Sequence, residues 1–246
     1  MNASVATSAG TQARPAAQAV AGPAPSRRVV DAATRMYHGL FALSFLGAYL
    51  TAEGERWRML HVTLGYTLAG LLVFRVVYGL FGPRQARLSA LWAKLSGGAD
   101  WLRSASRARA LAGVNWRQGQ NLLMALAVVC MLVTVVPVTL TGYASFNEWG
   151  PDALTDWHAW VGDAFLVLVL AHLGGLLALS LWRRKNLTTP MLTGRTEGRG
   201  PDLVKHNHAA LAALLLLAVA AYITWEWSQS PKGLIDWPSL WALFKN

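Results

Sequence analysis

The sequence is organised by an apolar stretch at residues 157–182, which reads WHAWVGDAFLVLVLAHLGGLLALSLW. As a helix that rises ~1.5 Å per residue, it is long enough to cross a hydrocarbon layer ~30 Å thick. Two histidines interrupt it, His158 and, fourteen positions later, His172. At ~100° per residue they lie within ~40° of one face and roughly 21 Å apart in depth. One face of this helix therefore carries two imidazoles, which are common metal ligands, at two depths.

The composition predicts a membrane protein. Of the 246 residues, 54% are hydrophobic and 14% are charged, whereas soluble domains have ~25% charged residues. The formal charge of +10 is typical of basic loops that flank membrane spans, so no nucleic-acid partner is expected. The single cysteine, Cys130, excludes an internal disulfide, a covalent CxxCH haem attachment and a cysteine-ligated iron–sulfur cluster.

Five apolar segments are predicted as transmembrane helices. They lie at about residues 36–51, 59–81, 121–143, 157–182 and 208–225. Pro137 predicts a kink in the third helix, and residues 88–95 and 101–111 mix apolar and basic residues as interfacial helices do. Residues 1–30, rich in Ala, Ser, Pro and Gly, are interpreted as a disordered cytoplasmic tail. The last residues, with Trp237 and Trp241, are interpreted as an interfacial segment.

The basic residues predict the orientation in the membrane. They concentrate in the N-terminal tail, in the loop 82–119 and in the loop 183–205, whereas the other two connections hold few. Basic loops stay on the cytoplasmic side. We therefore expect a cytoplasmic N-terminus and a periplasmic C-terminus.

Four histidines fall at matching depths in this topology. His61 and His158 lie near the outer ends of their helices, and His38 and His172 lie towards the inner side. The sequence thus offers two histidine pairs stacked along the membrane normal. Two imidazoles on opposite faces of a macrocycle suit haem iron and fill both axial positions, which favours electron transfer over oxygen chemistry.

Other residues on these helices suit such a site. Gly65 and Gly162, each four residues after a histidine, would let a ring approach the backbone, and Phe165 and Val169 would fill the space between the two sites. Arg75, at the depth of the inner pair, is a candidate partner for a haem propionate.

Each of these residues also has a structural interpretation. A single histidine in a helical bundle is often a hydrogen-bonded packing residue, and the glycines are also what helix packing alone requires. Arg75 can simply extend to the inner interface. Asp163 lies ~140° from the direction of His158, and it is either a buried hydrogen-bond partner of another helix or a proton relay. His206 and His208 are interpreted as interface residues.

Several short motifs surround the histidines. They are Arg35-Met-Tyr-His38, Arg58-Met-Leu-His61, Gly65-Tyr66, Phe74-Arg75, Gly82-Pro83, Ala86-Arg87, Thr141-Gly142, Asn186-Leu187 and Met191-Leu-Thr-Gly194-Arg195. Together they resemble the bacterial cytochrome b561 family, which includes the b-type cytochrome subunits of nickel–iron hydrogenases. The resemblance implies a four-helix bundle with two non-covalent b haems, whose ligands would be His38, His61, His158 and His172. It also implies electron exchange between the quinone pool and a redox partner.

The sequence therefore predicts an all-α membrane protein of the bacterial inner membrane. Residues 1–30 would form the tail, 31–195 the bundle with two haem b groups, and 196–246 a fifth transmembrane helix with a periplasmic interfacial tail. The expected partners are the lipid bilayer, a quinone or quinol, and a periplasmic c-type cytochrome or another oxidoreductase subunit of the dehydrogenase or hydrogenase type.

Two other functions fit the same residues. One is a stand-alone, quinol-linked reductase of superoxide or ferric iron. The other is a haem-free transporter or membrane anchor, in which Asp163, Arg75 and the histidines line a polar path. A zinc site fits less well, because the histidines separate into two pairs and not into a tetrahedral set.

Overall fold

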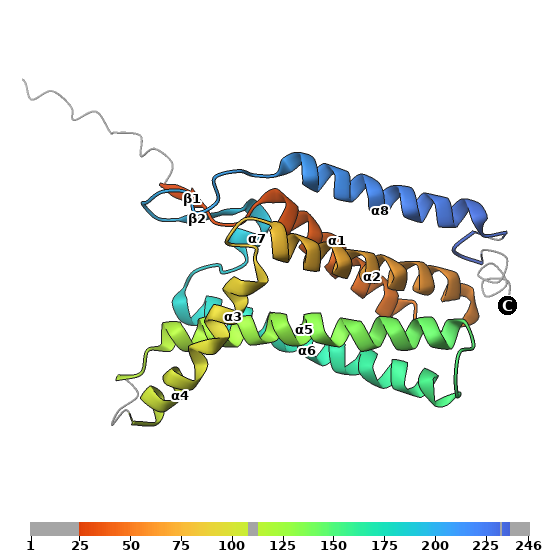
Figure 1. Cartoon of the computed structure of the whole chain (residues 1–246), viewed down its shortest axis with the longest axis horizontal. Helices are drawn as coiled ribbons and strands as arrows, with labels where there is room; N and C mark the ends of the chain where they lie inside the picture. The colour runs from red at the N-terminus through yellow and green to blue at the C-terminus, as the bar shows by residue number, and fades with distance from the viewer. Residues whose placement is uncertain (1–24, 108–112, 232, 237–246) are drawn as a thin grey trace, which may run out of the picture.

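The computed structural model describes residues 25–107, 113–231 and 233–236, and it is almost entirely helical. Its five long helices run along one common direction (Figure 1). They are α1 (Ala32–Leu50), α2 (Arg58–Phe81), α5 (Trp116–Phe146), α6 (Ala153–Arg183) and α8 (Ala209–Gln229). The five predicted apolar segments are thus confirmed as helices in the expected order. The helices α5 and α6, with 31 residues each, extend beyond the predicted limits at both ends.

Within the described residues, four helices are long and apolar enough to cross a membrane: α2 with the preceding turn (Glu55–Phe81), α5, α6 and α8. The 19-residue helix α1 does not belong to this group, because Arg35 and His38 lower its hydropathy. Large apolar side chains such as Phe81, Leu140 and Leu177 are exposed on the outer faces of the bundle, as contact with lipid requires. The chain is a multi-pass membrane protein.

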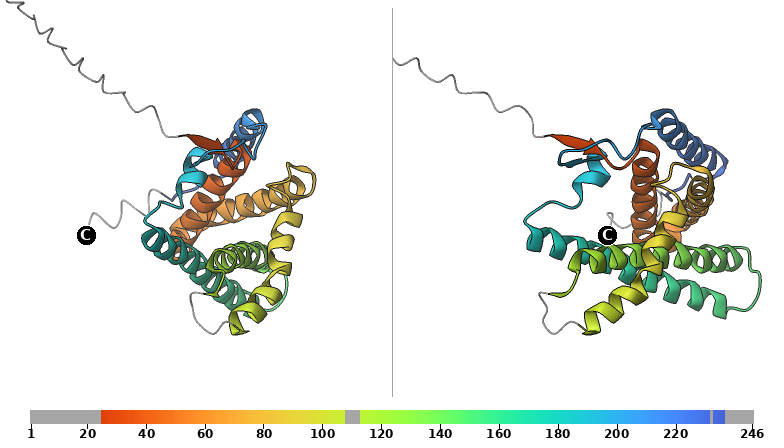
Figure 2. Two further views of the ribbon diagram at one scale, coloured as in Figure 1. Left: turned by 90° about the vertical axis from the view of Figure 1, so that its left-hand side faces the viewer. Right: turned by 60° about the vertical axis from the view of Figure 1, so that its left-hand side comes forward.

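The bundle consists of two helical hairpins. The helices α1 and α2 pack against each other, as do α5 and α6, and α2 joins the hairpins by packing on α5. The fifth long helix, α8, lies outside the bundle, mainly against α1 (Figure 2). Across the bundle, α1 and α6 meet through the aromatic rings of Phe41, Phe45 and Phe165.

One end of the bundle is strongly basic. We call it the basic end: α1, α5 and α8 begin here, and α2 and α6 end here (Figure 1). The opposite end, with residues 51–57 and 147–152, is the distal end. The basic residues at the basic end include Arg27, Arg28, Arg35, Arg84, Arg87, Arg183, Arg184, Lys185, Arg195, Arg199 and Lys205.

A folded segment covers the basic end. The strands β1 (Ser26–Arg28) and β2 (Arg195–Glu197) pair antiparallel, and the short helix α7 (Thr189–Thr193) precedes β2. The prediction of a disordered tail over residues 1–30 is therefore wrong for its last residues. They are ordered because their backbone pairs with β2 and because the amides of Val29 and Val30 donate to the Gly194 carbonyl. Residues 1–24 lie outside the described residues.

Two short helices join the hairpins. They are α3 (Leu88–Ser96) and α4 (Gly98–Arg107), near the segments predicted as interfacial helices, and residues 108–112 are not described. The helix α5 continues through Pro137, where a kink was predicted, as one element. At the distal end the turn η1 (Glu55–Trp57) precedes α2, and the amide of Asp236 donates to the Arg56 carbonyl. The predicted interfacial segment with Trp237 and Trp241 is outside the described part of the chain.

Candidate functional site

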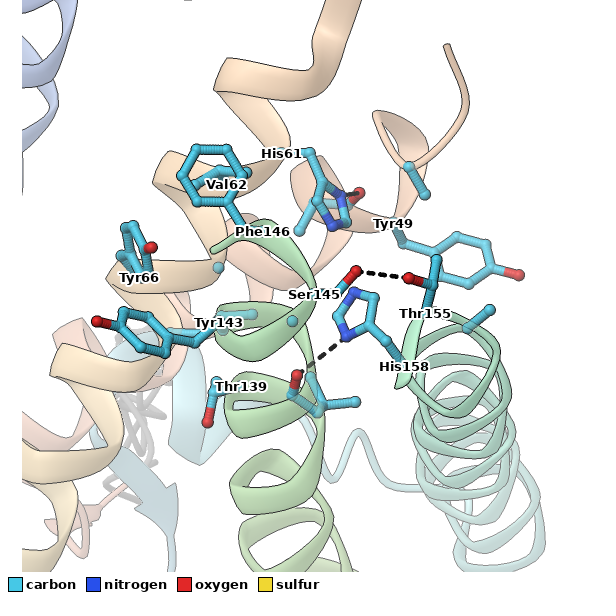
Figure 3. A pocket seen from close by; sticks show the side chains of 18 of the residues that line it. Tyr49, His61, Val62, Tyr66, Thr139, Tyr143, Ser145, Phe146, Thr155 and His158 are labelled. Carbon is cyan, nitrogen blue, oxygen red and sulfur yellow. Dashed lines mark hydrogen bonds between the residues drawn. The ribbon is translucent and has the colours of Figure 1, made fainter. Parts of the chain in front are cut away.

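Two histidines from different hairpins meet near the distal end. His61 lies in the first turns of α2 and His158 in the first turns of α6. Their ring centres are 5.8 Å apart and the ring planes are inclined by 87° (Figure 3). The pairing of these two residues by depth is therefore reproduced in the structure.

The Nδ1 atom of each ring is held by the backbone of a neighbouring helix. His61 Nδ1 donates to the Ala48 carbonyl of α1 at 2.8 Å, and His158 Nδ1 donates to the Val138 carbonyl of α5 at 3.0 Å. Ala48 is in the last turn of α1, and its carbonyl also accepts from the amide and the hydroxyl of Thr51, at 3.3 Å each. Because a carbonyl only accepts, both rings carry their proton on Nδ1, which leaves the lone pair of Nε2 for a metal ion.

A cavity of about 470 Å³ surrounds this pair, between α1, α2, α5 and α6. Both histidines line it, as do Gly65 and Gly162. A Cβ atom at either glycine would have no neighbour within 4 Å, so both glycines leave open space inside the cavity. The volume falls in the range of ~300–1,000 Å³ typical of sites for small molecules and cofactors.

A third glycine, Gly142 of α5, lies directly against His158. A Cβ atom here would come within 2.8 Å of His158 Cε1 and 3.0 Å of Nδ1. In the sequence, Gly142 stands out only as part of the Thr141-Gly142 motif, which does not predict this contact. No pattern in the sequence marks this contact, because it depends on how α5 packs against α6.

The second histidine pair lies nearer the basic end. His38 of α1 and His172 of α6 are close enough for their side chains to interact electrostatically. His38 is exposed, whereas His172 Nδ1 is buried and has no hydrogen-bond partner among the described residues. A buried ring nitrogen without a hydrogen-bond partner destabilises a protein. His172 Nδ1 is therefore a candidate to bind a group that is not part of the chain.

Phe165 separates the two pairs along α6. It stands seven residues from both His158 and His172, and only 1% of its surface is exposed. Its ring meets the edge of Phe45 at 4.6 Å between centres, and Phe41 lies at 6.3 Å. Val169, one turn further along, is half-buried. The space between the histidine pairs is thus filled by aromatic packing.

Arg75 is anchored near the basic end. Its Nη1 donates to the Ala86 carbonyl at 2.9 Å, which ties α2 to the turn before α3. The carboxylate of Asp31 lies close enough to act on the guanidinium electrostatically. A propionate-binding role for Arg75 stays a prediction.

The remaining polar residues singled out in the sequence have separate positions. Asp163 accepts a hydrogen bond from the Tyr49 hydroxyl of α1 at 3.1 Å. It therefore has a partner on another helix, but its side chain is exposed and not buried as expected, because it lies at the open side of the cavity. His208 contacts the Tyr78 ring at the basic end, with ring centres 6.2 Å apart, and His206 lies beside it.

The side chains that could ligate a metal ion are arranged in pairs. Within the described ranges, no group of three or more histidine, cysteine, aspartate or glutamate side chains is arranged to hold a metal ion. What the distal pair offers is two oriented imidazoles beside a cavity. This arrangement suits a planar metal complex that brings its own equatorial ligands.

The sequence matches a protein-family model. The model described as prokaryotic cytochrome b561 covers residues 29–194, which include all four histidines of the two pairs. Comparison with curated proteins and with solved structures gave no match.

Proposed function

The chain belongs to the prokaryotic cytochrome b561 family, and from this premise we propose that its two histidine pairs bind two b haems. Members of this family are membrane-bound b-type cytochromes of electron transfer. His61 and His158 would ligate the haem at the distal end, and His38 and His172 the haem nearer the basic end. A haem with imidazoles in both axial positions exchanges single electrons and has no open position for oxygen.

The distance between His61 and His158 is the observation that carries the proposal. Imidazole nitrogens bind metal ions at about 2 Å, so two rings facing one ion from opposite sides have centres roughly 6 Å apart. The 5.8 Å between the two rings agrees with this value. The Nδ1 hydrogen bonds to Ala48 and Val138 keep both Nε2 atoms unprotonated, and Gly65 and Gly162 keep space for the ring.

The second site is supported by His172 on α6 and His38 on α1. His172 Nδ1 is buried without a hydrogen-bond partner in the described part of the chain, and His38 of α1 is close enough to interact with His172 electrostatically. The two ligands on α6 would be separated by roughly 21 Å of helix, and the buried Phe165 lies between them. Two sites at these depths support electron transfer from one face of the membrane to the other.

We further propose that the basic end faces the cytoplasm of a bacterial cell and the distal end faces the periplasm. The concentration of arginine and lysine at the basic end supports this orientation. In this arrangement the protein links the quinone pool to a redox partner, either a periplasmic c-type cytochrome or a dehydrogenase- or hydrogenase-type subunit. A periplasmic partner would approach the distal end, where the cavity is bordered by the exposed Asp163.

The test is a reduced-minus-oxidised absorbance spectrum of the purified protein, with haem and protein quantified on the same sample. We expect two b haems per chain in the wild type and one in His61→Ala and in His158→Ala. His206→Ala is the matched control, because it removes an imidazole outside both pairs. A wild-type protein without haem, after expression with an adequate haem supply, would favour the transporter or anchor function. Quinol-dependent reduction of superoxide or ferric iron by the protein alone would favour the stand-alone reductase.

A further inference from the structure

The first two helices of the bundle carry the same pattern, Arg-Met-X-His, at Arg35–His38 and at Arg58–His61. Residues three apart lie on one side of a helix, one turn from each other. Because α1 and α2 run in opposite directions, Arg35 lies on the basic-end side of His38, and Arg58 lies on the distal side of His61. Each histidine thus has an arginine between it and the nearer end of the bundle.

The Arg35 side chain contacts the segment that covers the basic end. Its Nη1 donates to the Leu192 carbonyl at 2.9 Å, and its Nε lies against Gly194, where a Cβ atom would come within 3.2 Å. The guanidinium therefore holds the segment with α7 and β2 against α1. Arg75 is similarly engaged with the Ala86 carbonyl.

Arg58 has a different environment. It lines the same cavity as His61 and His158. Its guanidinium carbon lies 5.6 Å from the centre of the Phe146 ring, which also lines the cavity. Its ion pair with Glu55, at 3.5 Å, joins two exposed side chains, with 53% and 87% of their surfaces accessible. Exposed pairs of this kind hold their partners only weakly, so the guanidinium can turn to a better acceptor in the cavity.

We propose that Arg58 binds a propionate of the haem held by His61 and His158, and that it directs this edge of the haem towards the distal end. The inference rests on the proposed haem at this site. A haem propionate is a carboxylate, and guanidinium groups bind carboxylates through paired, charge-assisted hydrogen bonds. At the cavity mouth the pair stays close to water, which suits two charged groups better than the interior of the bundle.

The charge of Arg58 also acts on the iron. A fixed positive charge stabilises the reduced, electron-richer state of a nearby centre. Removing it in Arg58→Gln should lower the equilibrium constant for reduction of the distal haem about tenfold, equivalent to ~59 mV for one electron. The haem at His38 and His172 should keep its potential, because it lies nearer the basic end, roughly 21 Å of helix away from His158.

The experiment is a redox titration of the purified holoprotein, followed by the haem absorbance. Arg58→Gln is compared with Arg58→Lys, which keeps the charge, and with Arg56→Gln, which removes a neighbouring charge that does not line the cavity. The same pair of Arg58 variants in a His172→Ala background, where only the distal haem is expected, assigns the shift. A lower distal potential in Arg58→Gln, or loss of the distal haem reversed in Arg58→Lys, supports the proposal.

Three results separate the possible failures. A wild-type protein without haem would refute the proposed function itself. Two haems in the wild type, with equal potentials in Arg58→Gln and Arg56→Gln, would leave that function intact and overturn the role of Arg58. Loss of the distal haem in Arg58→Gln and Arg56→Gln alike would also overturn it, since the loss would then not depend on the guanidinium that lines the cavity.

Discussion

Gly142 of α5 lies directly against the imidazole of His158 on α6, so close that a Cβ atom would stand 2.8 Å from ring carbon Cε1. The same ring is held on its Nδ1 by the carbonyl of Val138, one turn earlier in α5. The helix α5 carries no histidine, yet it sets the position of one. The distal pair therefore depends on the packing of α5 against α6 as much as on the two helices that carry the ligands.

Gly142→Ala should displace His158. The added methyl group would have to push the ring away or force α5 and α6 apart, and overpacking of this kind costs about 1–3 kcal/mol. Disturbing the groups that orient a ligand histidine weakens binding about 10- to 100-fold. We expect the haem content to fall while the other haem is retained, measured by haem and protein quantification. Gly70→Ala is the control, since a Cβ atom there has no neighbour within 4 Å. Full haem content in Gly142→Ala would show that Gly142 does not determine the position of His158.

At Gly65 and Gly162, unlike at Gly142, we expect haem binding to tolerate a small side chain and to be lost with a large one. Alanine at either position should be tolerated, because a Cβ atom points into open space. Leucine should fill part of the cavity of about 470 Å³ and exclude the haem from the distal site without unfolding the bundle. The measurements are haem stoichiometry and helix content by circular dichroism. If Gly65→Leu and Gly162→Leu both keep two haems, the cavity is not the haem site.

Phe165→Ala should destabilise the bundle more than a substitution at the lipid-facing surface. The ring is buried and packs on Phe41 and Phe45, and truncation of a buried Phe to Ala costs about 3–5 kcal/mol. The matched control is Leu140→Ala, which truncates an exposed apolar side chain of α5. Thermal unfolding in detergent, followed by circular dichroism, compares the two. Equal shifts of the melting temperature would show that Phe165 does not hold α1 against α6.

The histidine pairs were predictable because depth and helix direction decide them. An apolar run has a measurable beginning, and consecutive spans alternate in direction, so the depth of each histidine follows from its position in the run. His61 and His158 therefore pair without any knowledge of packing. The same reasoning placed five helices in the correct order, although α5 and α6 extend past their apolar cores, where polar residues continue the helical hydrogen bonding.

The rest of the structure depends on contacts between distant segments. The strands β1 and β2 have three residues each, too few for a pattern, and they form because the chain after α6 returns to the start of α1. The contact of Gly142 with His158 and the anchoring of Arg75 on Ala86 each require a neighbouring element. Asp31 is another such case: the sequence shows an ordinary acidic residue before an apolar helix, and the structure buries it.

Asp31 links the start of α1 to the end of α2 through hydrogen bonds. Asp31→Ala should therefore lower the free energy of unfolding. Its Oδ1 accepts from the Thr34 amide at 2.6 Å, and its Oδ2 accepts from the Tyr78 hydroxyl at 2.9 Å. Asp31→Ala loses a helix cap and leaves a Tyr78 hydroxyl without its acceptor, at a cost of about 1–3 kcal/mol. Tyr78→Phe removes only the second bond and should cost about 1 kcal/mol.

The double variant Asp31→Ala/Tyr78→Phe tests whether the hydrogen bond between the two side chains stabilises the protein, or whether each side chain acts on its own. If the hydrogen bond between the two side chains contributes to stability, the double variant should lose less free energy of unfolding than the sum of the single variants. Asp31→Asn separates the two bonds, because its one amide oxygen can still cap the helix, whereas the NH2 group in place of Oδ2 cannot accept from the Tyr78 hydroxyl. Denaturant or thermal unfolding of the purified proteins gives the three values. Strict additivity would mean that the two helices are held together by the surrounding apolar packing alone, and that the buried carboxylate acts only on its own helix.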